Sequence, residues 1–302
     1  MRELIWRLRE AGFADGQLYE REPMSRHTTM KVGGPADLLV EPDGEAQLLA
    51  ALEIARGMGV PVLTLCGGSN LIVRDGGVRG LTVKLADRFA RLEKRDNRIH
   101  AQAGARLKAV ALLAQREGLS GFEFAAGIPG SVGGAVLMNA GAYGGEIVDV
   151  LISGRVLSGG IVTEYDNRGF EFSYRNSRVM REGGVVLSAV FELKPGDPEA
   201  IEERMRDLAE RRRDKQPLHL PSAGSTFKRP EGHYAAALIE QAGLKGLAVG
   251  GAMVSTKHAG FVVNAGGATA RDVIELIELV REKVHAHSGV LLTPEVRIVG
   301  ED

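Results

Sequence analysis

Apolar residues in the first two thirds of the chain fall mainly in short runs bounded by glycine, proline or aspartate. Runs of this length and composition are typical of β-strands rather than helices. Strands are predicted at 36–42, 60–66, 81–86 and 184–197. Residues 150–165 (VLISGRVLSGGIVTEY) predict a β-hairpin, because two such runs flank Gly159-Gly160, a pair that suits a tight turn.

Helical spacing of apolar residues separates these strands and dominates the last third of the chain. EAQLLAALEIARGMG (45–59) and ARLKAVALLAQREG (105–118) predict two helices. Residues 197–216 predict a third, charged helix with one apolar face. That face consists of Ile201, Met205 and Leu208.

A capping box predicts where the last helix begins. Thr269 and Asp272 have the spacing at which each side chain can bond the other residue's backbone N–H. An apolar stripe at helical spacing follows, and Gly289 lies just past its end, where glycine commonly terminates a helix. LLTPEVRIVG (291–300) predicts a closing strand.

The change from strands to helices near 194–198 predicts a domain boundary. The chain has 302 residues, which favours two domains over one. We expect an α+β protein with a first domain at 1–195 and a smaller α+β domain at 196–302. The first domain would comprise an N-terminal segment and two α+β subdomains that divide near 80–85.

Composition and charge narrow the functional classes. Apolar residues make up 44% and charged residues 25%, as in ordinary globular proteins, and the net charge of −1 gives no electrostatic footprint for nucleic acid or a membrane. The single cysteine, Cys66, excludes an internal disulfide and a cysteine-based zinc site. With no apolar leader and no membrane-length run, we expect a cytoplasmic protein that binds neither nucleic acid nor membrane and holds no metal.

Forty glycines are the one unusual feature of the composition. Many gather in KVGGPADLLVEP (31–42), CGGSNL (66–71) and GIPGSVGGAVLMNAGAYGGE (127–146). Ordering glycine costs more entropy than ordering any other residue, so such clusters indicate that the backbone must approach something closely. Backbone N–H groups in glycine loops can converge on a phosphate, and paired loops suit a long diphosphate such as a dinucleotide.

The spacing of these glycines excludes the common nucleotide-binding loops. A Rossmann fingerprint requires G-x-G-x-x-G, but Val62 stands where the third glycine should follow Gly57 and Gly59. No G-x-x-x-x-G-K-[ST] loop is present. For any single Gly-Gly pair a tight turn or close strand crossing is the better interpretation. The three clusters together favour a cofactor cradle.

Six motifs follow one another along nearly the whole chain. They are GGSNLIVRDGGVRGL (67–81), GFEFAAGIPGSVGGAVLMNAGAYGGEI (121–147), SYRNS (173–177), PSAGSTFKRP (221–230), KHAGFVVNAGGATARDV (257–273) and PEVRI (294–298). In content and order they resemble the UDP-N-acetylenolpyruvoylglucosamine reductase, or MurB, family of peptidoglycan synthesis. The resemblance extends from about Thr28 to Arg297.

The resemblance implies a two-part FAD-binding domain of the vanillyl-alcohol oxidase and p-cresol methylhydroxylase type, followed by a substrate-binding domain. FAD would be held non-covalently, with its diphosphate on the 67–70 and 127–134 loops. The residues that the resemblance assigns to FAD are Val32, Gly33, Gly67, Gly68, Ser69, Asn70, Gly127, Ile128, Pro129, Gly130, Ser131, Gly133, Gly134, Asn139, Ala140, Gly141 and Arg297.

The family reaction reduces the enolpyruvyl ether of UDP-N-acetylglucosamine enolpyruvate to UDP-N-acetylmuramate, with NADPH as co-substrate. Hydride would pass from flavin N5 to C3 of the enolpyruvyl group, which places negative charge on C2 that must be stabilised and then protonated. By their positions in the motifs, Arg175 and Glu295 would stabilise this intermediate and Ser225 would protonate C2. The other substrate-binding residues would be Tyr174, Lys228 and Arg229.

The chain departs from the family pattern at two places. Cys66 stands where the family often has a glycine, and a buried position at a strand end is favoured over a redox role. After SYRNS the sequence continues directly into the strand predicted at 184–197, so it lacks the long insertion of some members. The chain therefore resembles the short, type II form, and how that form closes over its substrate is left open.

Two other functions are compatible with such a cradle. An oxidase of the same flavin fold often tethers FAD through His or Cys, and Cys66 is the only candidate beside the glycine loops. A non-catalytic nucleotide-sensing module would not need Arg175, Ser225 and Glu295, which are all present. We therefore expect a monomeric, NADPH-dependent flavin reductase that acts on a small-molecule substrate.

Overall fold

The computed structural model describes all 302 residues, and its contacts divide the chain into two compact units. The first unit comprises Met1–Tyr19, Leu38–Gly67 and Gly80–Arg212. The second comprises Glu20–Asp37, Gly68–Arg79 and Arg213–Asp302. Because contacts group separate segments of the chain, the predicted sequence domains, 1–195 and 196–302, stay a prediction.

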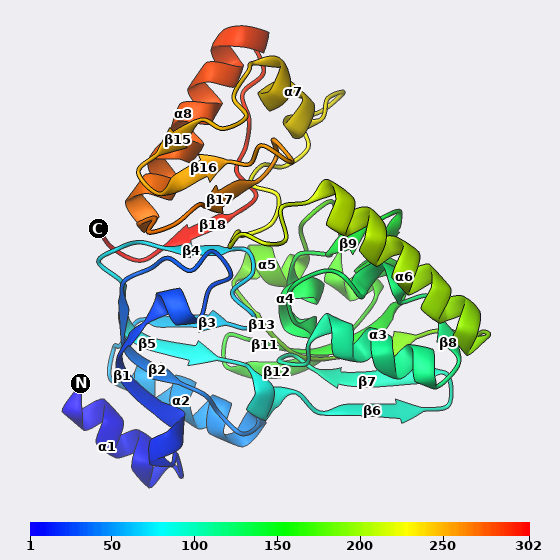
Figure 1. Ribbon diagram of the computed structural model, residues 1–302. Helices are drawn as coiled ribbons and strands as arrows, with labels where there is room; N and C mark the ends of the chain where they lie inside the picture. Colours follow the sequence, from blue (N-terminus) through cyan, green and yellow to red (C-terminus); the bar gives the residue numbers. More distant parts are fainter. The chain divides into compact units, whose positions relative to one another are not determined.

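The first unit is built around a five-stranded antiparallel sheet in the order β12-β11-β13-β7-β6 (Figure 1). Its strands are β6 (Leu92–Arg95), β7 (Arg98–Gln102), β11 (Leu151–Ser158), β12 (Ile161–Asp166) and β13 (Val185–Glu192). Strands β11 and β12 form the predicted hairpin, in which Ser158 pairs with Ile161. Gly159 and Gly160 have φ values of 58° and 85°, the left-handed region in which glycine costs least.

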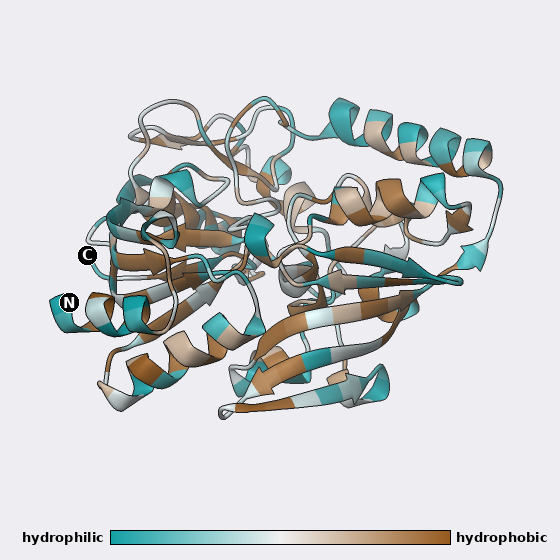
Figure 2. Ribbon diagram, turned by 90° about the horizontal axis from the view of Figure 1, so that it is seen from below, coloured by the Kyte–Doolittle hydropathy of each residue, from teal (hydrophilic) through white to brown (hydrophobic).

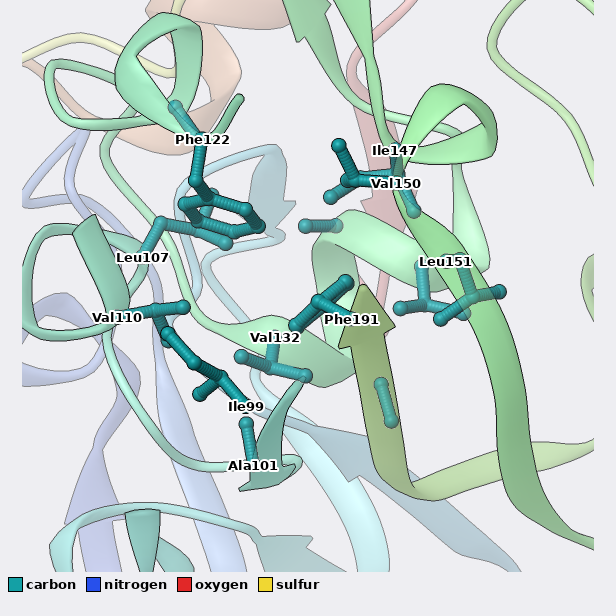
Figure 3. Packing of buried hydrophobic residues seen from close by; sticks show 14 of the residues in the cluster. Ile99, Ala101, Leu107, Val110, Phe122, Val132, Ile147, Val150, Leu151 and Phe191 are labelled. Carbon is teal, nitrogen blue, oxygen red and sulfur yellow. The ribbon is translucent and has the colours of Figure 1, made fainter. Parts of the chain in front are cut away.

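Helices of the first unit contact this sheet at β7, β11 and β13. The helices of the unit are α1 (Arg2–Glu10), α2 (Glu45–Gly57), α3 (Leu107–Arg116), α4 (Val132–Leu137), α5 (Arg178–Glu182) and α6 (Pro198–Lys215), whose last residues belong to the second unit. Helix α4 packs on β13, α3 packs on β7, and α5 contacts β11. Figure 3 shows the core, in which the ring centroids of Phe122 and Phe191 lie 4.9 Å apart.

Helix α6 has the apolar face that the sequence predicts. Ile201 and Leu208 are buried, and Met205 packs against the same core while partly buried. The remainder of the helix is strongly hydrophilic, as its mostly teal ribbon in Figure 2 shows. The predicted helix at 197–216 is thereby confirmed to within a residue at each end.

A four-stranded sheet has the order β1-β2-β5-β3. Its strands are β1 (Leu18–Pro23), β2 (Pro35–Val40), β3 (Val62–Leu65) and β5 (Val78–Lys84). Strands β3 and β5 run parallel, with Val62 opposite Leu81. The first unit also contains two short antiparallel pairs: β8 (Leu119–Ser120) with β14 (Lys194–Pro195), and β9 (Gly141–Ala142) with β10 (Gly145–Glu146).

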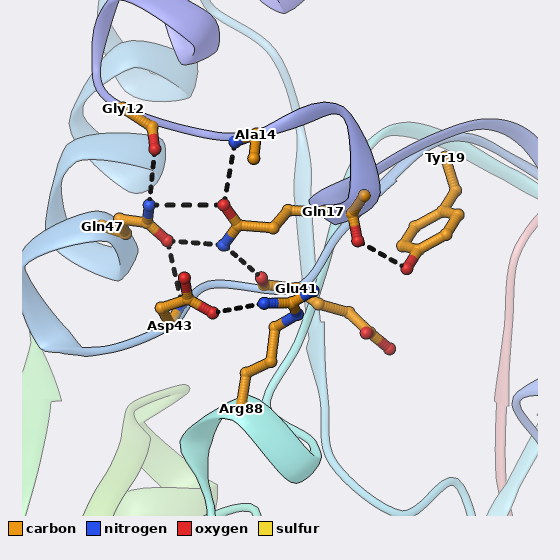
Figure 4. Close-up of polar contacts among 9 residues, drawn as sticks. Gly12, Ala14, Gln17, Tyr19, Glu41, Asp43, Gln47 and Arg88 are labelled. Atoms are coloured by element: carbon orange, nitrogen blue, oxygen red, sulfur yellow. Dashed lines mark hydrogen bonds and ion pairs between the residues drawn. The ribbon is translucent and has the colours of Figure 1, made fainter.

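A buried glutamine ties the N-terminal segment to α2 (Figure 4). Gln17 is 1% exposed, and its Nε2 donates to Glu41 O at 2.9 Å and to Gln47 Oε1 at 2.8 Å. Its Oε1 accepts from the Ala14 N–H at 2.9 Å. Gln47 in turn donates to Gly12 O at 2.8 Å. The two side-chain amides therefore satisfy backbone groups in the connections that follow α1 and β2.

The second unit packs one long helix on small sheets. Its elements are β4 (Leu71–Val73), α7 (Ala235–Gln241), β15 (Ala248–Val249), β16 (Ala252–Val254), β17 (Val262–Asn264), α8 (Ala270–Ser288) and β18 (Arg297–Val299). Strands β15, β16 and β17 form an antiparallel sheet that contacts α8. The predicted caps are confirmed: Thr269 accepts from the Asp272 N–H at 3.1 Å, and Gly289 has φ 74°. No helix of the chain is long and apolar enough to cross a bilayer.

The predicted strand at 291–300 is wrong in extent. Only Arg297–Val299 forms a strand, β18, which pairs in parallel with β4. The residues before it bond elsewhere, because Pro294 forms an isolated bridge with Phe227 and has no N–H to continue a ladder. The segment thus changes partner between Pro294 and Arg297, and this change of partner positions part of the site.

Candidate active site

In the second unit, that change of partner brings Ser225 and Glu295 onto neighbouring segments. Phe227 is bridged to Pro294, and Glu295 donates its N–H to Thr226 O at 2.8 Å. Ser225 directly precedes Thr226. The two predicted catalytic residues, which are 70 positions apart in sequence (295 − 225), therefore lie side by side.

Asn70 joins the CGGSNL cluster to the same segment. Its Nδ2 donates to Glu295 O at 3.1 Å, and its carbonyl accepts from the Arg297 N–H at 3.1 Å. Asn70, Glu295 and Arg297 thus form one group in the second unit. The side-chain amide of Asn70 positions the Glu295 backbone, a role that the sequence analysis did not assign to it.

Hydrogen bonds hold the backbone next to Ser225, while Ser225 itself is exposed. Thr226 is buried, donates its N–H to Gly260 O at 2.9 Å and accepts from the Val262 N–H at 3.0 Å through its hydroxyl. On the other side Gly224 has φ 79°, which gives the loop its sharp bend. An exposed hydroxyl between two fixed neighbours is well placed to act on a bound ligand.

The predicted substrate residues Lys228 and Arg229 follow on the same loop. The Lys228 N–H donates to Thr293 O at 2.9 Å, which continues the pairing to the Glu295 segment. The Arg229 guanidinium lies over the Tyr234 ring, 4.0 Å from its centroid, and both residues are exposed. The loop therefore carries two cations within four residues of Ser225.

Two glycines of the second unit that were predicted to contact FAD, Gly33 and Gly68, have close neighbours within the chain. A Cβ at Gly68 would lie 1.9 Å from His27 O, and Gly68 has φ 59°. Gly33 has φ 127°, and a Cβ there would lie 2.8 Å from the Cβ of Val73. Val32 is 2% exposed within a hydrophobic cluster. These positions have packing roles of their own, and their assignment to FAD, like that of Ser69, stays a prediction.

In the first unit, the predicted 127–134 loop is a loop only as far as Ser131. Val132 begins α4, so Gly133 and Gly134 form its first turn. The N–H groups of Val132 and Gly133 donate to Ala105 O and Ala103 O, both at 2.8 Å, and are therefore not available to a ligand. The sequence did not predict this helix, because two glycines are unfavourable in a helical turn.

Other N–H groups of this loop remain available. Those of Gly130 and Ser131 form no backbone hydrogen bond within the chain, whereas the Gly134 N–H bonds to the thiol of Cys66. The Ser131 hydroxyl is buried and also has no hydrogen-bond partner. Gly67 lies against the loop, because a Cβ there would be 3.2 Å from the Gly130 Cα. Polar groups left unpaired beside a glycine-lined backbone fit a phosphate ligand such as the FAD diphosphate.

The predicted residues Gly127, Ile128 and Pro129 open this loop. The Ile128 N–H donates to Ala125 O at 3.0 Å, and its side chain packs against the hydrophobic core. Gly127 and Pro129 are exposed. A Cβ at Gly127 would meet the side chain of Arg212, which the sequence analysis did not single out.

A second group in the first unit surrounds Arg175. Ser173 and Asn176 exchange backbone hydrogen bonds of 3.1 and 3.2 Å across a tight turn whose tip is Tyr174 and Arg175. The Arg175 guanidinium donates to Asn139 O at 3.3 Å and to Gly141 O at 3.0 Å. It also lies 5.0 Å from the centroid of the Tyr174 ring. The turn and the side chain together fix the direction of the guanidinium.

Asn139 and Glu146 support this group from behind. Asn139 is 2% exposed, donates to Glu146 Oε2 at 2.9 Å and accepts from the Val148 N–H at 3.0 Å. The other oxygen, Glu146 Oε1, lies 3.9 Å from Arg175 Nη1. Ala140 is buried beside them. The sequence analysis missed Glu146, although it stands inside the quoted motif at 121–147.

The last residue of the SYRNS motif has a structural role. Ser177 is fully buried, donates from its hydroxyl to Leu137 O at 2.6 Å and accepts from the Met180 N–H at 3.2 Å. It therefore caps α5 and ties that helix to the end of α4. This explains why a serine stands two residues after Arg175.

Cys66 directly follows β3 and lies against α4. A Cβ at Gly133 would be 3.0 Å from its Sγ. Burial raises the pKa of the Cys66 thiol to about 11. The thiol is therefore neutral at physiological pH, which disfavours nucleophilic attack on a flavin.

Comparison with known proteins gives a consistent result. A family model described as "UDP-N-acetylenolpyruvoylglucosamine reductase, C-terminal domain" matches residues 216–299, and one described as "FAD binding domain" matches residues 36–163. A UDP-N-acetylenolpyruvoylglucosamine reductase of Clostridioides difficile is 49% identical over 93% of both chains. One of Clostridium botulinum is 47% identical over 96% of this chain and 95% of its own.

Solved structures agree with these matches. The crystal structure of UDP-N-acetylenolpyruvylglucosamine reductase (MurB) from Thermus caldophilus is 37% identical, with a TM-score of 0.79 over 91% of this chain and 97% of its own. An alkyldihydroxyacetonephosphate synthase has a TM-score of 0.50 over 65% of this chain at 18% identity, which shows a shared fold alone. The expected flavin-domain fold of the vanillyl-alcohol oxidase type is thereby confirmed.

Proposed function

Because the chain belongs to the UDP-N-acetylenolpyruvoylglucosamine reductase family, we propose that it reduces UDP-N-acetylglucosamine enolpyruvate to UDP-N-acetylmuramate with NADPH. The observation that carries this proposal is the 49% identity to a named reductase over 93% of both chains. The presence in one chain of an FAD-binding domain and of the reductase C-terminal domain supports it further.

The cofactor of this reaction is a non-covalently held FAD. Bound FAD supplies a two-electron carrier that is reduced by NADPH and that reduces C3 of the enolpyruvyl group. The free N–H groups of Gly130 and Ser131 and the unpaired Ser131 hydroxyl are the groups that would hold its diphosphate. The raised pKa of Cys66, to about 11, supports non-covalent binding, because a neutral thiol is a poor nucleophile.

Residues of the chain stabilise the negative charge of the intermediate and supply the proton for C2. Arg175, fixed by the carbonyls of Asn139 and Gly141, binds the enolpyruvyl carboxylate through its planar fork. Glu295, in its neutral form, donates a hydrogen bond to the enolate-like intermediate. Ser225 gives its hydroxyl proton to C2, and the cations Lys228 and Arg229 favour the alkoxide that remains until solvent reprotonates it.

Product analysis tests the proposal directly. With NADPH and the enolpyruvyl substrate, we expect a product heavier than the substrate by two hydrogen atoms, one NADPH consumed per product and no uptake of oxygen. Acid denaturation should release all of the flavin into the supernatant. Oxygen consumption in place of reduced product, or flavin that stays with the precipitate, would instead support an oxidase of the same fold.

A substitution at Ser225 tests the proton donor. In Ser225→Ala we expect NADPH to reduce the flavin at the wild-type rate, while the enolpyruvyl substrate reoxidises it about 100-fold or more slowly, because general acid catalysis is lost. Ser222→Ala, three positions away, is the matched control. Equal turnover of Ser225→Ala and wild type would remove Ser225 from this role.

The setting of the reaction follows from the same proposal. The substrate is a small molecule, and no helix of the chain is long and apolar enough to cross a bilayer. We propose a cytoplasmic monomer, which light scattering on a size-exclusion column would test at several protein concentrations.

A further inference from the structure

Arg212, near the end of α6, is a partly buried cation without a partner. Its Nε is inaccessible to solvent and makes no hydrogen bond, and no carboxylate forms an ion pair with the guanidinium. The adjacent Arg211 differs, because it is exposed and pairs with Asp207 at 2.9 Å on the same helix. Burying an unpaired charge is costly, so the burial of Arg212 calls for an anion that the chain itself does not supply.

The side chain of Arg212 lies on the first residue of the glycine loop. A Cβ at Gly127 would be 3.2 Å from Arg212 Cδ and 3.3 Å from Nη1, so glycine is what allows the stem and guanidinium to lie there. Burial lowers the pKa of the Arg212 guanidinium, and only Tyr143 acts in the opposite direction. The cation therefore lies against the loop whose N–H groups at Gly130 and Ser131 are also unpaired.

We propose that Arg212 binds the diphosphate of FAD, as the cationic partner of the 127–131 loop. The inference rests on the proposed function for the identity of the cofactor. Backbone N–H groups alone bind phosphate through partial charges, whereas a guanidinium adds a full charge and up to five N–H donors. An anion held by the loop is the ligand that would satisfy both sets of unpaired groups at once.

The test compares Arg212→Met with Arg211→Met in the full-length protein after removal of bound flavin. Methionine keeps the apolar stem and removes the charge. FAD and riboflavin, which lacks phosphate, are titrated into each protein, and the quenching of flavin fluorescence gives the dissociation constant. For Arg212→Met we expect FAD binding to weaken about 10- to 100-fold, the range of a charge-assisted hydrogen bond. Riboflavin binding, and FAD binding by Arg211→Met, should each change less than about twofold.

Salt and a conservative variant sharpen the test. The wild-type dissociation constant for FAD should rise more steeply with KCl than that of Arg212→Met, because screening weakens charge pairs. Arg212→Lys should recover part of the lost affinity, since it restores the charge without the fork. In thermal melts of the flavin-free proteins, Arg212→Met should be at least as stable as wild type, because it removes a buried, unpaired charge.

The outcomes separate this inference from the proposed function. If the wild-type protein binds no FAD, the proposed function fails. If the wild type binds FAD and Arg212→Met binds it equally well, only the inference on Arg212 is overturned, even if the KM for NADPH or for the UDP-sugar rises. Equal losses for FAD and riboflavin would also overturn it, because the effect would then be independent of the diphosphate.

Discussion

At the residue scale, part of the site is held in an unfavourable backbone conformation. Asn139, Tyr143 and Arg175 have φ values of 46°, 52° and 54°, and none of them is glycine. For residues other than Asn and Asp, this region costs about 1–2 kcal/mol each. The surrounding bonds, such as the pair between Ser173 and Asn176, hold the turn in place. The direction of the Arg175 guanidinium is therefore fixed at some cost in stability.

The conservative change Arg175→Lys tests whether that fixed fork matters. Lysine keeps the charge but cannot donate two parallel hydrogen bonds to a carboxylate. We expect reoxidation of reduced flavin by the enolpyruvyl substrate to slow by about 100-fold, the size of one lost transition-state donor, while NADPH reduces the flavin at an unchanged rate. Stopped-flow absorbance measures both steps, and Arg178→Lys is the control. An equal slowing of both steps would indicate a general disturbance instead.

The thiol of Cys66 provides a pH-dependent prediction. Its pKa is about 11 in the folded protein, against about 8.5 for an exposed thiol. The folded state therefore favours the neutral form, so this contribution to stability is full below pH 8.5 and is lost as the pH rises towards 11. Cys66→Ala should lack that alkaline loss in thermal melts at pH 8–11. A thiol reagent at pH 8 should modify native Cys66 at least about 100-fold more slowly than unfolded protein.

Some residues of the site could be predicted from the sequence, and others could not. Arg175, Ser225 and Glu295 could be proposed because short motifs surround them. Arg212 could not, since it stands in a run of like charges, RRRDK, that reads as a solvated helix face. What distinguishes it from Arg211 is burial against Gly127, a contact between positions far apart in the sequence. Such a contact leaves no local signal.

At the scale of elements, local signals gave the most reliable predictions. The hairpin at Gly159-Gly160 and the caps at Thr269 and Gly289 depend on neighbouring residues, and all are confirmed. The strand predicted at 291–300 failed because its first residues pair with a distant loop at Phe227. Helix α4 was missed because Gly133 and Gly134 are unfavourable in a helical turn, and the carbonyls of Ala103 and Ala105 that accept from its first N–H groups lie far away in sequence.

The Gln17 network is an element-scale feature with a measurable contribution to stability. Gln17→Ala would leave Glu41 O and the Ala14 N–H without their partner and would remove one of the hydrogen bonds of the Gln47 amide. We expect the free energy of unfolding to fall by about 2–4 kcal/mol. Urea denaturation measures the change. Gln115→Ala is the control, because its one hydrogen bond is long, 3.4 Å, and exposed, and it should cost less than about 0.5 kcal/mol.

The first turn of α4 tests whether its glycines serve a ligand. A Cβ at Gly134 would meet nothing within 4 Å, so Gly134→Ala fits the protein and improves helix propensity by up to about 1 kcal/mol. We expect the flavin-free variant to be as stable as wild type or more so, yet to bind FAD at least about tenfold more weakly. Gly57→Ala, also in open space at a helix end, is the matched control. Unchanged FAD affinity would show that Gly134 does not face the cofactor.

At the scale of the whole molecule, the two units draw on interleaved parts of the chain. Segments at Glu20–Asp37 and Gly68–Arg79 belong with the C-terminal part, so the glycine cluster at 66–71 is divided between the units at Gly67. Sequence reasoning places boundaries between continuous stretches, and it cannot show that an early loop such as Asn70 is bonded to Glu295. The family resemblance predicted the fold and the cofactor. Which segments of the chain belong to which unit follows only from the contacts in the structure.

Cofactor binding should stabilise the whole molecule by mass action. A ligand present at about 100 times its dissociation constant adds about 2.7 kcal/mol to the free energy of unfolding. We therefore expect the melting temperature to rise with FAD concentration, and to rise less in Gly134→Ala than in wild type. A melting temperature independent of added FAD in flavin-free protein would contradict the assignment of the glycine loops.

An anaerobic absorbance titration tests most sharply whether one flavin carries two electrons from NADPH to the enolpyruvyl substrate. Purified protein should be yellow from bound oxidised flavin, about one equivalent of NADPH should bleach it, and one equivalent of UDP-N-acetylglucosamine enolpyruvate should restore the colour without oxygen. Bleaching that only oxygen reverses would contradict the reductase assignment and favour an oxidase. Protein that takes up no flavin at all would contradict the interpretation of the glycine loops themselves.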